Sequence, residues 1–135
     1  MTTYGDDVLT VFVEESRERL ASIERGLLVL EKNDHDADVA MIHGIFREAH
    51  SIKAGANLLH LRNIEGLAHK LENILERMRK RELTPTGRII SILLEGLDAM
   101  REMVEDVEVG EARDVSALLE RLGRVAGLRA GAQRT

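Results

Sequence analysis

Apolar residues recur at helical spacing in five successive segments, and this pattern constrains the fold more than any other feature of the chain. In the first segment Leu20, Ile23, Leu27 and Leu30 follow one another at steps of three or four residues, which places them on one face of an α-helix. A polar stretch at 32–38 (KNDHDAD) ends this segment. The five segments are approximately Leu9–Leu30, Asp38–Leu58, Asn63–Arg81, Pro85–Val107 and Val115–Leu128.

Four long amphipathic helices with short connections predict an all-α fold, an antiparallel up-down-up-down four-helix bundle with an additional C-terminal helix. The chain has one proline and 2% aromatic residues, so its 44% of hydrophobic residues must form a mainly aliphatic core. The length of 135 residues suits one domain, which we expect to span 1–130, with 131–135 as a tail or the start of a linker. Thr84 and Pro85 are expected to begin the fourth helix, as its N-cap and its first residue.

Charge and composition exclude several classes of function. A net charge of −5 argues against a nucleic-acid-binding protein, which needs a basic face to neutralise phosphates. The absence of cysteine excludes disulfides, thiolate metal sites and a cysteine nucleophile. No apolar run reaches the roughly 18 residues of a membrane span, and the N-terminus lacks the features of a signal peptide. We therefore expect a soluble cytoplasmic protein with no membrane insertion.

The stretch FREAHSIKAGANLLHL (46–61) places a histidine, His50, on an otherwise ordinary amphipathic helix. His50 follows the apolar Ala49 by about 100°, so it should lie at the edge of the core face with one ring nitrogen toward water. Lys53, three residues on, shares this face and can bring its ammonium close to a group bound to the imidazole. We expect three small or polar residues to leave a shallow docking surface beside it: Ala54, Gly55 and Asn57. Close packing of a neighbouring helix would be an equally good reason for the glycine.

The third segment offers a partner for the imidazole in AHKLENIL (68–75). A nucleophilic imidazole needs one free nitrogen and an acceptor that holds the other as N–H. His69 and Glu72 lie on one side of the third helix, and antiparallel packing about a turn near 59–62 would bring them level with His50. A carboxylate at this point would select the tautomer and stabilise positive charge on the ring.

Two other interpretations compete with this one. An exposed histidine on a helix is usually an ordinary surface residue, and most lysines like Lys53 are simply solvated. Four-helix bundles also bind metals through Glu-x-x-His pairs, but the chain has only the single pair Glu65 and His69, four residues apart.

The two histidine-bearing motifs together resemble those of the histidine phosphotransfer (HPt) domain. AHSIKAGANLL (49–59), followed by AHKLENILERMRKREL (68–83), is most similar to the N-terminal phosphorylated (P1) domain of the CheA-type chemotaxis histidine kinases. The segments VFVEESRERLASIERGLLVLE (11–31) and LTPTGRIISILLEGLDAM (83–100) resemble the first and fourth helices of that family. The resemblance thus extends over most of the chain.

The resemblance implies a role for each residue that matches the family motifs. His50 would be the phosphoryl acceptor and donor, and Lys53 would offset phosphoryl charge. Glu72 would hold the other ring nitrogen of His50, with His69 as a second member of that hydrogen-bond network. Gly55 would belong to the small surface that partners approach.

The sequence departs from the family at one site residue, because Ala54 stands where the family usually has the first of two glycines after the lysine. An added methyl group should affect the fit of partners more than the chemistry of phosphorylation.

The resemblance also implies the partners and cofactors of this domain. The chain has no Walker-type loop or glycine-rich nucleotide motif, so ATP and magnesium should be used by partner domains, and the domain itself should bind no cofactor. A histidine kinase catalytic domain would deliver the phosphoryl group, and a CheY-like response-regulator receiver domain would take it onto an aspartate, in a chemotaxis-type pathway. The chain would thus be a phosphotransfer module of a protein-histidine kinase, monomeric in isolation. The alternative is a non-catalytic helical interaction module in which His50 is incidental.

Overall fold

The computed structural model describes residues 3–32 and 38–128, and over these residues the chain is helical with no strand. The helices are α1 (Thr3–Lys32), α2 (Val39–Leu58), α3 (Arg62–Arg79), α4 (Gly87–Glu105), α5 (Val107–Ala112) and α6 (Ser116–Ala126). The predicted tail 131–135 and most of the polar stretch 32–38 lie outside the described residues. None of the described helices is both long and apolar enough to span a membrane.

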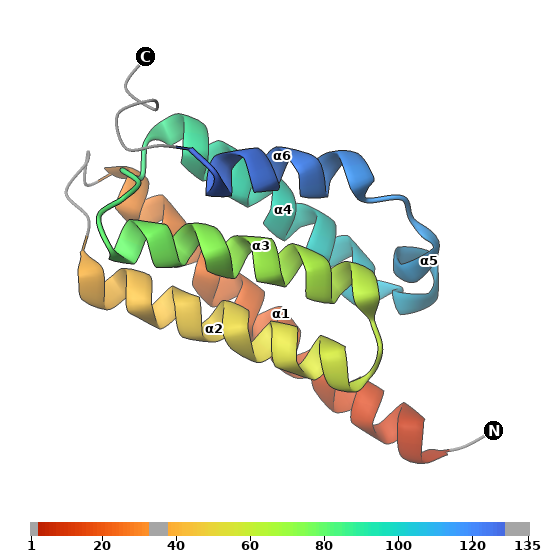
Figure 1. Cartoon of the computed structure of the whole chain (residues 1–135). Helices are drawn as coiled ribbons and strands as arrows, with labels where there is room; N and C mark the ends of the chain where they lie inside the picture. Colours follow the sequence, from red (N-terminus) through yellow and green to blue (C-terminus); the bar gives the residue numbers. More distant parts are fainter. Residues whose placement is uncertain (1–2, 33–37, 129–135) are drawn as a thin grey trace.

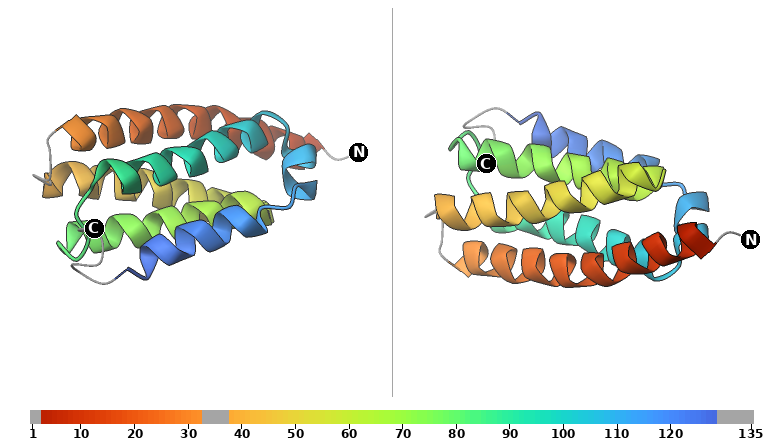
Figure 2. Two further views of the ribbon diagram at one scale, coloured as in Figure 1. Left: turned by 90° about the horizontal axis from the view of Figure 1, so that it is seen from above. Right: turned by 90° about the horizontal axis from the view of Figure 1, so that it is seen from below.

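Helices α1 to α4 form the predicted antiparallel four-helix bundle (Figure 1). Helix α2 packs against α1 and α3, while α4 packs against α1 and α3 on the opposite side of the bundle. The expected additional C-terminal helix is α6, which packs on α3 and α4. Figure 2 shows the short α5 lying across one end of the bundle, between α4 and α6. The predicted fold class is confirmed.

The core is aliphatic, as composition predicts. Leu20, Ile23, Leu27 and Leu30 are fully buried along α1, in agreement with their spacing. Phe12 is the one aromatic side chain among the buried residues of the described part of the chain. Helices α2, α3 and α4 complete the core with Ile42, Ile45, Ile52, Ile64, Leu67, Leu71, Ile74, Leu75, Met78, Leu93, Leu97 and Met100.

The start of α4 differs from the prediction. Its N-cap is Thr86, whose side chain accepts a hydrogen bond from the backbone N–H of Ile89, and the helix begins at Gly87. Pro85 lies before the helix and is buried. Thr84 and Thr86 both precede the apolar residues of the helix at a spacing suitable for an N-cap. Thr86 is the cap because its hydroxyl accepts from the backbone N–H of Ile89, three residues on.

The fourth predicted helix, Pro85–Val107, corresponds to α4, which ends at Glu105, and the short α5 that follows was not predicted. Asp106 leaves helical conformation, with φ −147° and ψ 87°, and its side chain accepts a hydrogen bond from the backbone N–H of Val109. Aspartate competes for backbone donors in this way, so one residue ends α4 and caps α5.

Helix α5 positions the start of α3. The N-cap residue of α3 is Leu61, whose apolar side chain cannot accept a hydrogen bond from the helix. The Glu111 carboxylate accepts hydrogen bonds from the backbone N–H groups of Arg62, at 2.7 Å, and Asn63, at 3.0 Å. The Asn63 side chain in turn donates to the carbonyl oxygens of Gly110 and Arg113, both at 2.8 Å. These bonds satisfy two of the free donors at the start of α3 and tie it to α5.

Candidate functional site

Helix α2 presents His50 on the surface of the bundle. The helix begins at a capping residue, Asp38, whose carboxylate accepts a hydrogen bond from the backbone N–H of Met41. The buried face of α2 consists of Ile42, Ile45, Ala49, Ile52 and Ala56. His50 follows Ala49 and leaves this face, so its side chain is 57% exposed.

Glu72 of α3 connects His50 and Lys53 and makes the central contact of the site. Its Oε2 lies 2.5 Å from His50 Nδ1, and its Oε1 accepts a hydrogen bond of 2.7 Å from Lys53 Nζ. Each carboxylate oxygen therefore has its own partner on α2. The predicted antiparallel register is correct for Glu72, which lies level with His50.

The Glu72 carboxylate is the most buried charged group of the site, with a side chain only 9% exposed. Burial raises the pKa of this carboxyl, but the hydrogen bonds from Lys53 and His50 and the positive charge of Lys53 outweigh burial, so its pKa is lowered from its usual value. Glu72 is thus a carboxylate at neutral pH, and a carboxylate only accepts hydrogen bonds.

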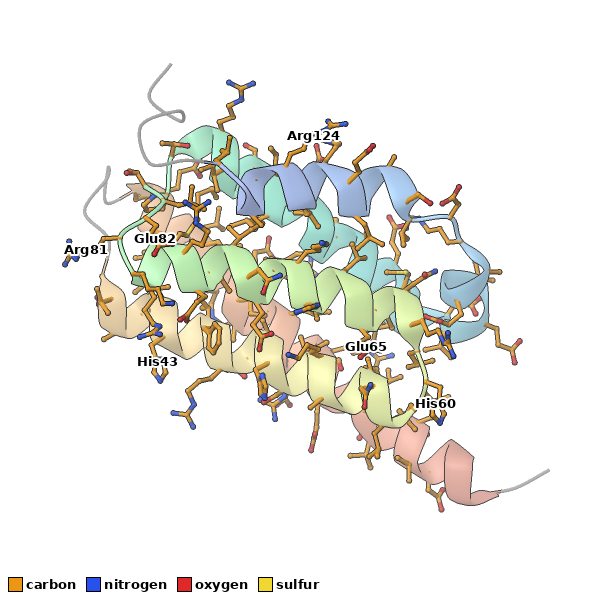
Figure 3. The ribbon with its side chains drawn as sticks, viewed as in Figure 1. His43, His60, Glu65, Arg81, Glu82 and Arg124 are labelled. Atoms are coloured by element: carbon orange, nitrogen blue, oxygen red, sulfur yellow. The ribbon has the colours of Figure 1, made fainter. Side chains whose placement is uncertain are left out.

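This geometry selects one form of the imidazole. Because Glu72 accepts, His50 Nδ1 carries the hydrogen, so the lone pair of the neutral ring is on Nε2, at the opposite edge of the ring from Glu72. The ring of Phe46 stacks on that of His50 with centroids 6.5 Å apart, which restricts rotation of the imidazole. His43 stacks on the other end of this row, with its centroid 6.3 Å from Phe46, and Figure 3 shows it pointing away from the bundle. An oriented, exposed imidazole nitrogen is a nucleophile.

A shallow depression of about 450 Å³ lies beside the imidazole, between α2 and α3. It is lined by Phe46, Arg47, His50, Ser51, Glu72, Asn73 and Glu76. The depression therefore gives solvent and partners access to the His50 ring from the surface.

His69 does not join the carboxylate network. Its side chain is exposed, and among the described residues no hydrogen bond or ion pair joins it to His50 or Glu72. Three residues correspond to about 60° around a helix, so Glu72 turns toward α2 while His69 turns outward. Its role in the network stays a prediction.

The expected docking surface is only partly contiguous. Ala54 and Asn57 are exposed on the His50 side of α2, and the Asn57 amide donates a hydrogen bond of 2.8 Å to Glu65. Gly55 lies on the side that faces α1, where an added Cβ would come within 2.8 Å of the Phe12 ring. Close packing of helices thus explains the glycine, which was expected to clear a surface beside His50. Its contact with a partner is untested.

Two features of the site were not predicted from the sequence, the stacking of Phe46 and the position of Arg47. Phe46 is apolar, yet its ring is only half-buried and stacks on His50. The spacing of four residues between them could have predicted this contact. Arg47, three residues before His50, is exposed and lines the depression.

The metal-site alternative has no support in the described part of the chain. No group of three or more His, Cys, Asp or Glu side chains there is arranged to hold a metal ion. Glu65, one half of the single candidate pair, accepts its hydrogen bond from Asn57.

A helical bundle that presents one oriented imidazole nitrogen to solvent has the architecture of a histidine phosphotransfer protein. Residues 7–110 match the model of the Hpt domain family. The chain therefore belongs to the Hpt domain family.

The chain is similar to chemotaxis protein CheA of several organisms. It is 34% identical over 116 residues to CheA of Bacillus subtilis, covering 84% of this chain and 17% of that protein. The identity to CheA of Treponema pallidum is 31% over 120 residues, covering 87% of this chain and 14% of that protein. The chain thus spans less than a fifth of the length of these curated relatives.

Two solved structures share the fold. One is the phosphorylated P1 domain of CheA3 in complex with CheY6 from R. sphaeroides, with a TM-score of 0.74 and 26% identity, covering 90% of this chain and 97% of that chain. The other is the histidine phosphotransfer domain of CheA, with a TM-score of 0.75 and 28% identity, covering 87% of this chain and 90% of that chain.

Proposed function

We propose that His50 accepts a phosphoryl group from ATP bound to a histidine kinase catalytic domain and passes it to an aspartate of a CheY-like receiver domain. One observation carries the proposal: Glu72 holds Nδ1 at 2.5 Å and leaves Nε2 exposed. Membership of the Hpt domain family supports the phosphotransfer chemistry, and the complex of a related phosphorylated P1 domain with CheY6 supports the receiver as a partner.

The first transfer forms a bond from His50 Nε2 to the γ-phosphorus. The lone pair of Nε2 attacks the phosphorus, the bond to the β–γ bridging oxygen breaks, and ADP leaves with that electron pair. The ring becomes positively charged while Nδ1 keeps its hydrogen. The Glu72 carboxylate lies against this hydrogen and stabilises the charge that develops.

The second transfer reverses the bonding at His50. A receiver carboxylate oxygen attacks the phosphorus, the P–N bond breaks, and its electron pair returns to the imidazole. Glu72 keeps the same tautomer throughout, so the domain is ready for the next cycle. Rigid helices hold both residues, which suits a site that must meet two partners in turn.

Lys53 and the partner domains supply the remaining charge stabilisation. We propose that Lys53 offsets phosphoryl charge while it also holds Glu72 through their 2.7 Å hydrogen bond. ATP and magnesium belong to the kinase domain, and magnesium also to the receiver, so this domain needs no cofactor of its own. Because ATP is the donor, we place the domain in the cytoplasm.

The test is phosphorylation of the purified domain by a cognate kinase catalytic domain with radiolabelled ATP. We expect a label that is stable in base and lost in acid, and we expect His50→Gln to abolish it. His43→Gln is the matched control, because His43 is another exposed histidine of the same helix, and it should be labelled normally. An unlabelled wild type would refute the proposal and favour a non-catalytic interaction module. Undiminished label on His50→Gln would place the acceptor elsewhere.

A further inference from the structure

Arg47 is an exposed cation that has no partner among the described residues. It lines the depression that also contains His50, and no ion pair or hydrogen bond joins it to another described side chain. The residues three and four positions away on α2 include no acid, so the helix itself offers Arg47 no counter-charge.

The acidic residues that adjoin Arg47 in the sequence or line its depression already have partners, and Glu72 is held by His50 and Lys53. Glu48, the next residue, pairs with Arg19 of α1 at 2.7 Å. Glu76 lines the depression but pairs with Arg79 at 2.7 Å and with Lys80 at 3.5 Å. The guanidinium of Arg47 is therefore available to an anion that enters the depression.

The two cations that flank His50 are in different situations. Lys53 follows it by three residues and Arg47 precedes it by three, so they lie about 60° to either side of His50 on the helix. Lys53 turns toward α3, where its ammonium neutralises Glu72 at 2.7 Å. Arg47 lies on the other side of His50 along the helix surface and lines the same depression as His50. Because Nδ1 faces Glu72, the reactive Nε2 lies on the opposite edge of the ring from this carboxylate.

We propose that the guanidinium of Arg47 binds oxygen atoms of the phosphoryl group on His50 Nε2. A guanidinium offers planar paired donors that match phosphoryl oxygens, and its charge is not neutralised within the site. Glu72 and Lys53 together contribute no net charge, so Arg47 supplies the positive charge that the arriving group meets. The inference rests on the proposed function, because it assumes that His50 is the phosphorylated residue.

A small phosphoryl donor separates contact with the phosphoryl group from contact with a kinase. Phosphoramidate can phosphorylate the domain directly: Nε2 attacks phosphorus, the P–N bond of phosphoramidate breaks, and its protonated amine leaves as ammonia with the bonding electrons. No partner protein takes part in this reaction. A ³¹P NMR titration of the product then reports the pKa of the phosphoryl group itself.

The variants are Arg47→Ala, Arg47→Lys and a matched control, Arg88→Ala. Arg88 is an exposed arginine of α4, a helix that makes no contact with α2 in the described structure, and its removal changes the net charge equally. We expect Arg47→Ala to slow phosphorylation by phosphoramidate about threefold to tenfold, as for the loss of one partly exposed charge-assisted contact. The phosphoryl pKa should rise in Arg47→Ala, because the dianion loses a cation. Arg47→Lys should restore part of both effects, and Arg88→Ala should match wild type.

Each other outcome overturns the inference. A titration curve and rate for Arg47→Ala that superimpose on wild type would refute it. If Arg47→Ala slowed only the reaction with the kinase domain, Arg47 would act in docking and would not bind the phosphoryl group. These outcomes leave the proposed function intact. The ³¹P signal should appear in the wild-type domain and be absent from His50→Gln. If the wild-type domain gave no such signal, the proposed function would be refuted, and this inference with it.

Discussion

Glu72→Gln is the sharpest test of the site, because it keeps the size of the side chain and removes its charge. The carboxylate accepts from two donors, His50 Nδ1–H and Lys53 Nζ. An amide has one oxygen that accepts and one nitrogen that donates, so one of these two donors must face another donor. A hydrogen bond to a charged group contributes about 1.5–3 kcal/mol, and water competes here because the His50 side chain is 57% exposed. About 1–2 kcal/mol of transition-state stabilisation should be lost, which slows phosphorylation roughly fivefold to thirtyfold.

The assay is the initial rate of His50 phosphorylation by a kinase catalytic domain, at a domain concentration well below saturation. Glu76→Gln is the matched control, since Glu76 lies one turn on, lines the same depression and pairs with Arg79 and Lys80. Its rate should equal that of wild type. A Glu72→Gln rate within twofold of wild type, with helical content preserved, would show that the carboxylate does not stabilise the reacting ring. An equal loss in both variants would indicate a general effect of charge.

Three further predictions concern stability, and urea denaturation checks all of them. The pKa of Glu72 is lowered from 4.5 in the folded state, so its contribution to the free energy of unfolding is present above pH 4.5 and is lost as the pH falls through the lowered pKa. Glu72→Gln should therefore flatten the fall in stability at acid pH. An unchanged dependence of stability on pH would mean that other carboxyl groups cause this fall. Gly55→Ala brings a Cβ within 2.8 Å of the Phe12 ring and should cost about 1–3 kcal/mol, whereas Gly44→Ala, with nothing within 4 Å, should stabilise by up to about 1 kcal/mol. Equal effects of the two glycine substitutions would refute the packing argument. Glu111→Ala removes the acceptor of two backbone N–H groups at the start of α3 and should cost about 1 kcal/mol, as for the loss of an N-cap; no loss would mean that water replaces the carboxylate.

The contact between His50 and Glu72 could be predicted from the sequence because it depends on simple regularities. Helical periodicity identifies α2 and α3, a short connection makes them antiparallel, and equal rise per residue then brings the two side chains level. The buried face of α2 follows from the same periodicity, because its five buried residues recur at steps of three or four along the helix. These features depend on backbone geometry that is the same in every helix.

The features that could not be predicted depend on contacts between distant segments. The reason for Gly55 is Phe12, which lies 43 residues earlier in the sequence (55 − 12), and only the approach of α1 to α2 brings them together. Glu111 caps α3 from 48 residues away through Asn63, and nothing near Leu61 indicates this contact. His69 and Glu72 share a side of α3 on a helical wheel. The position of α2 decides which of the two side chains contacts His50, and this position cannot be read from the wheel.

The role of Lys53 follows from its coupling to Glu72 and can be separated from that of Arg47 by paired substitutions. Lys53 touches the carboxylate at 2.7 Å, so a lysine that acts by holding Glu72 has little left to do once the carboxylate is removed. Lys53→Met should therefore slow phosphorylation in the wild-type background and slow it less in the Glu72→Gln background, where only its action on phosphoryl charge is left to lose. Such non-additivity is expected for residues in one network. Arg47 has no hydrogen bond or ion pair with Glu72 among the described residues, so Arg47→Ala should multiply the loss caused by Glu72→Gln. If Lys53→Met slowed phosphorylation by the same factor in the Glu72→Gln background as in the wild-type background, the ammonium would act on the phosphoryl group directly. Its bond to Glu72 would then be secondary to the chemistry.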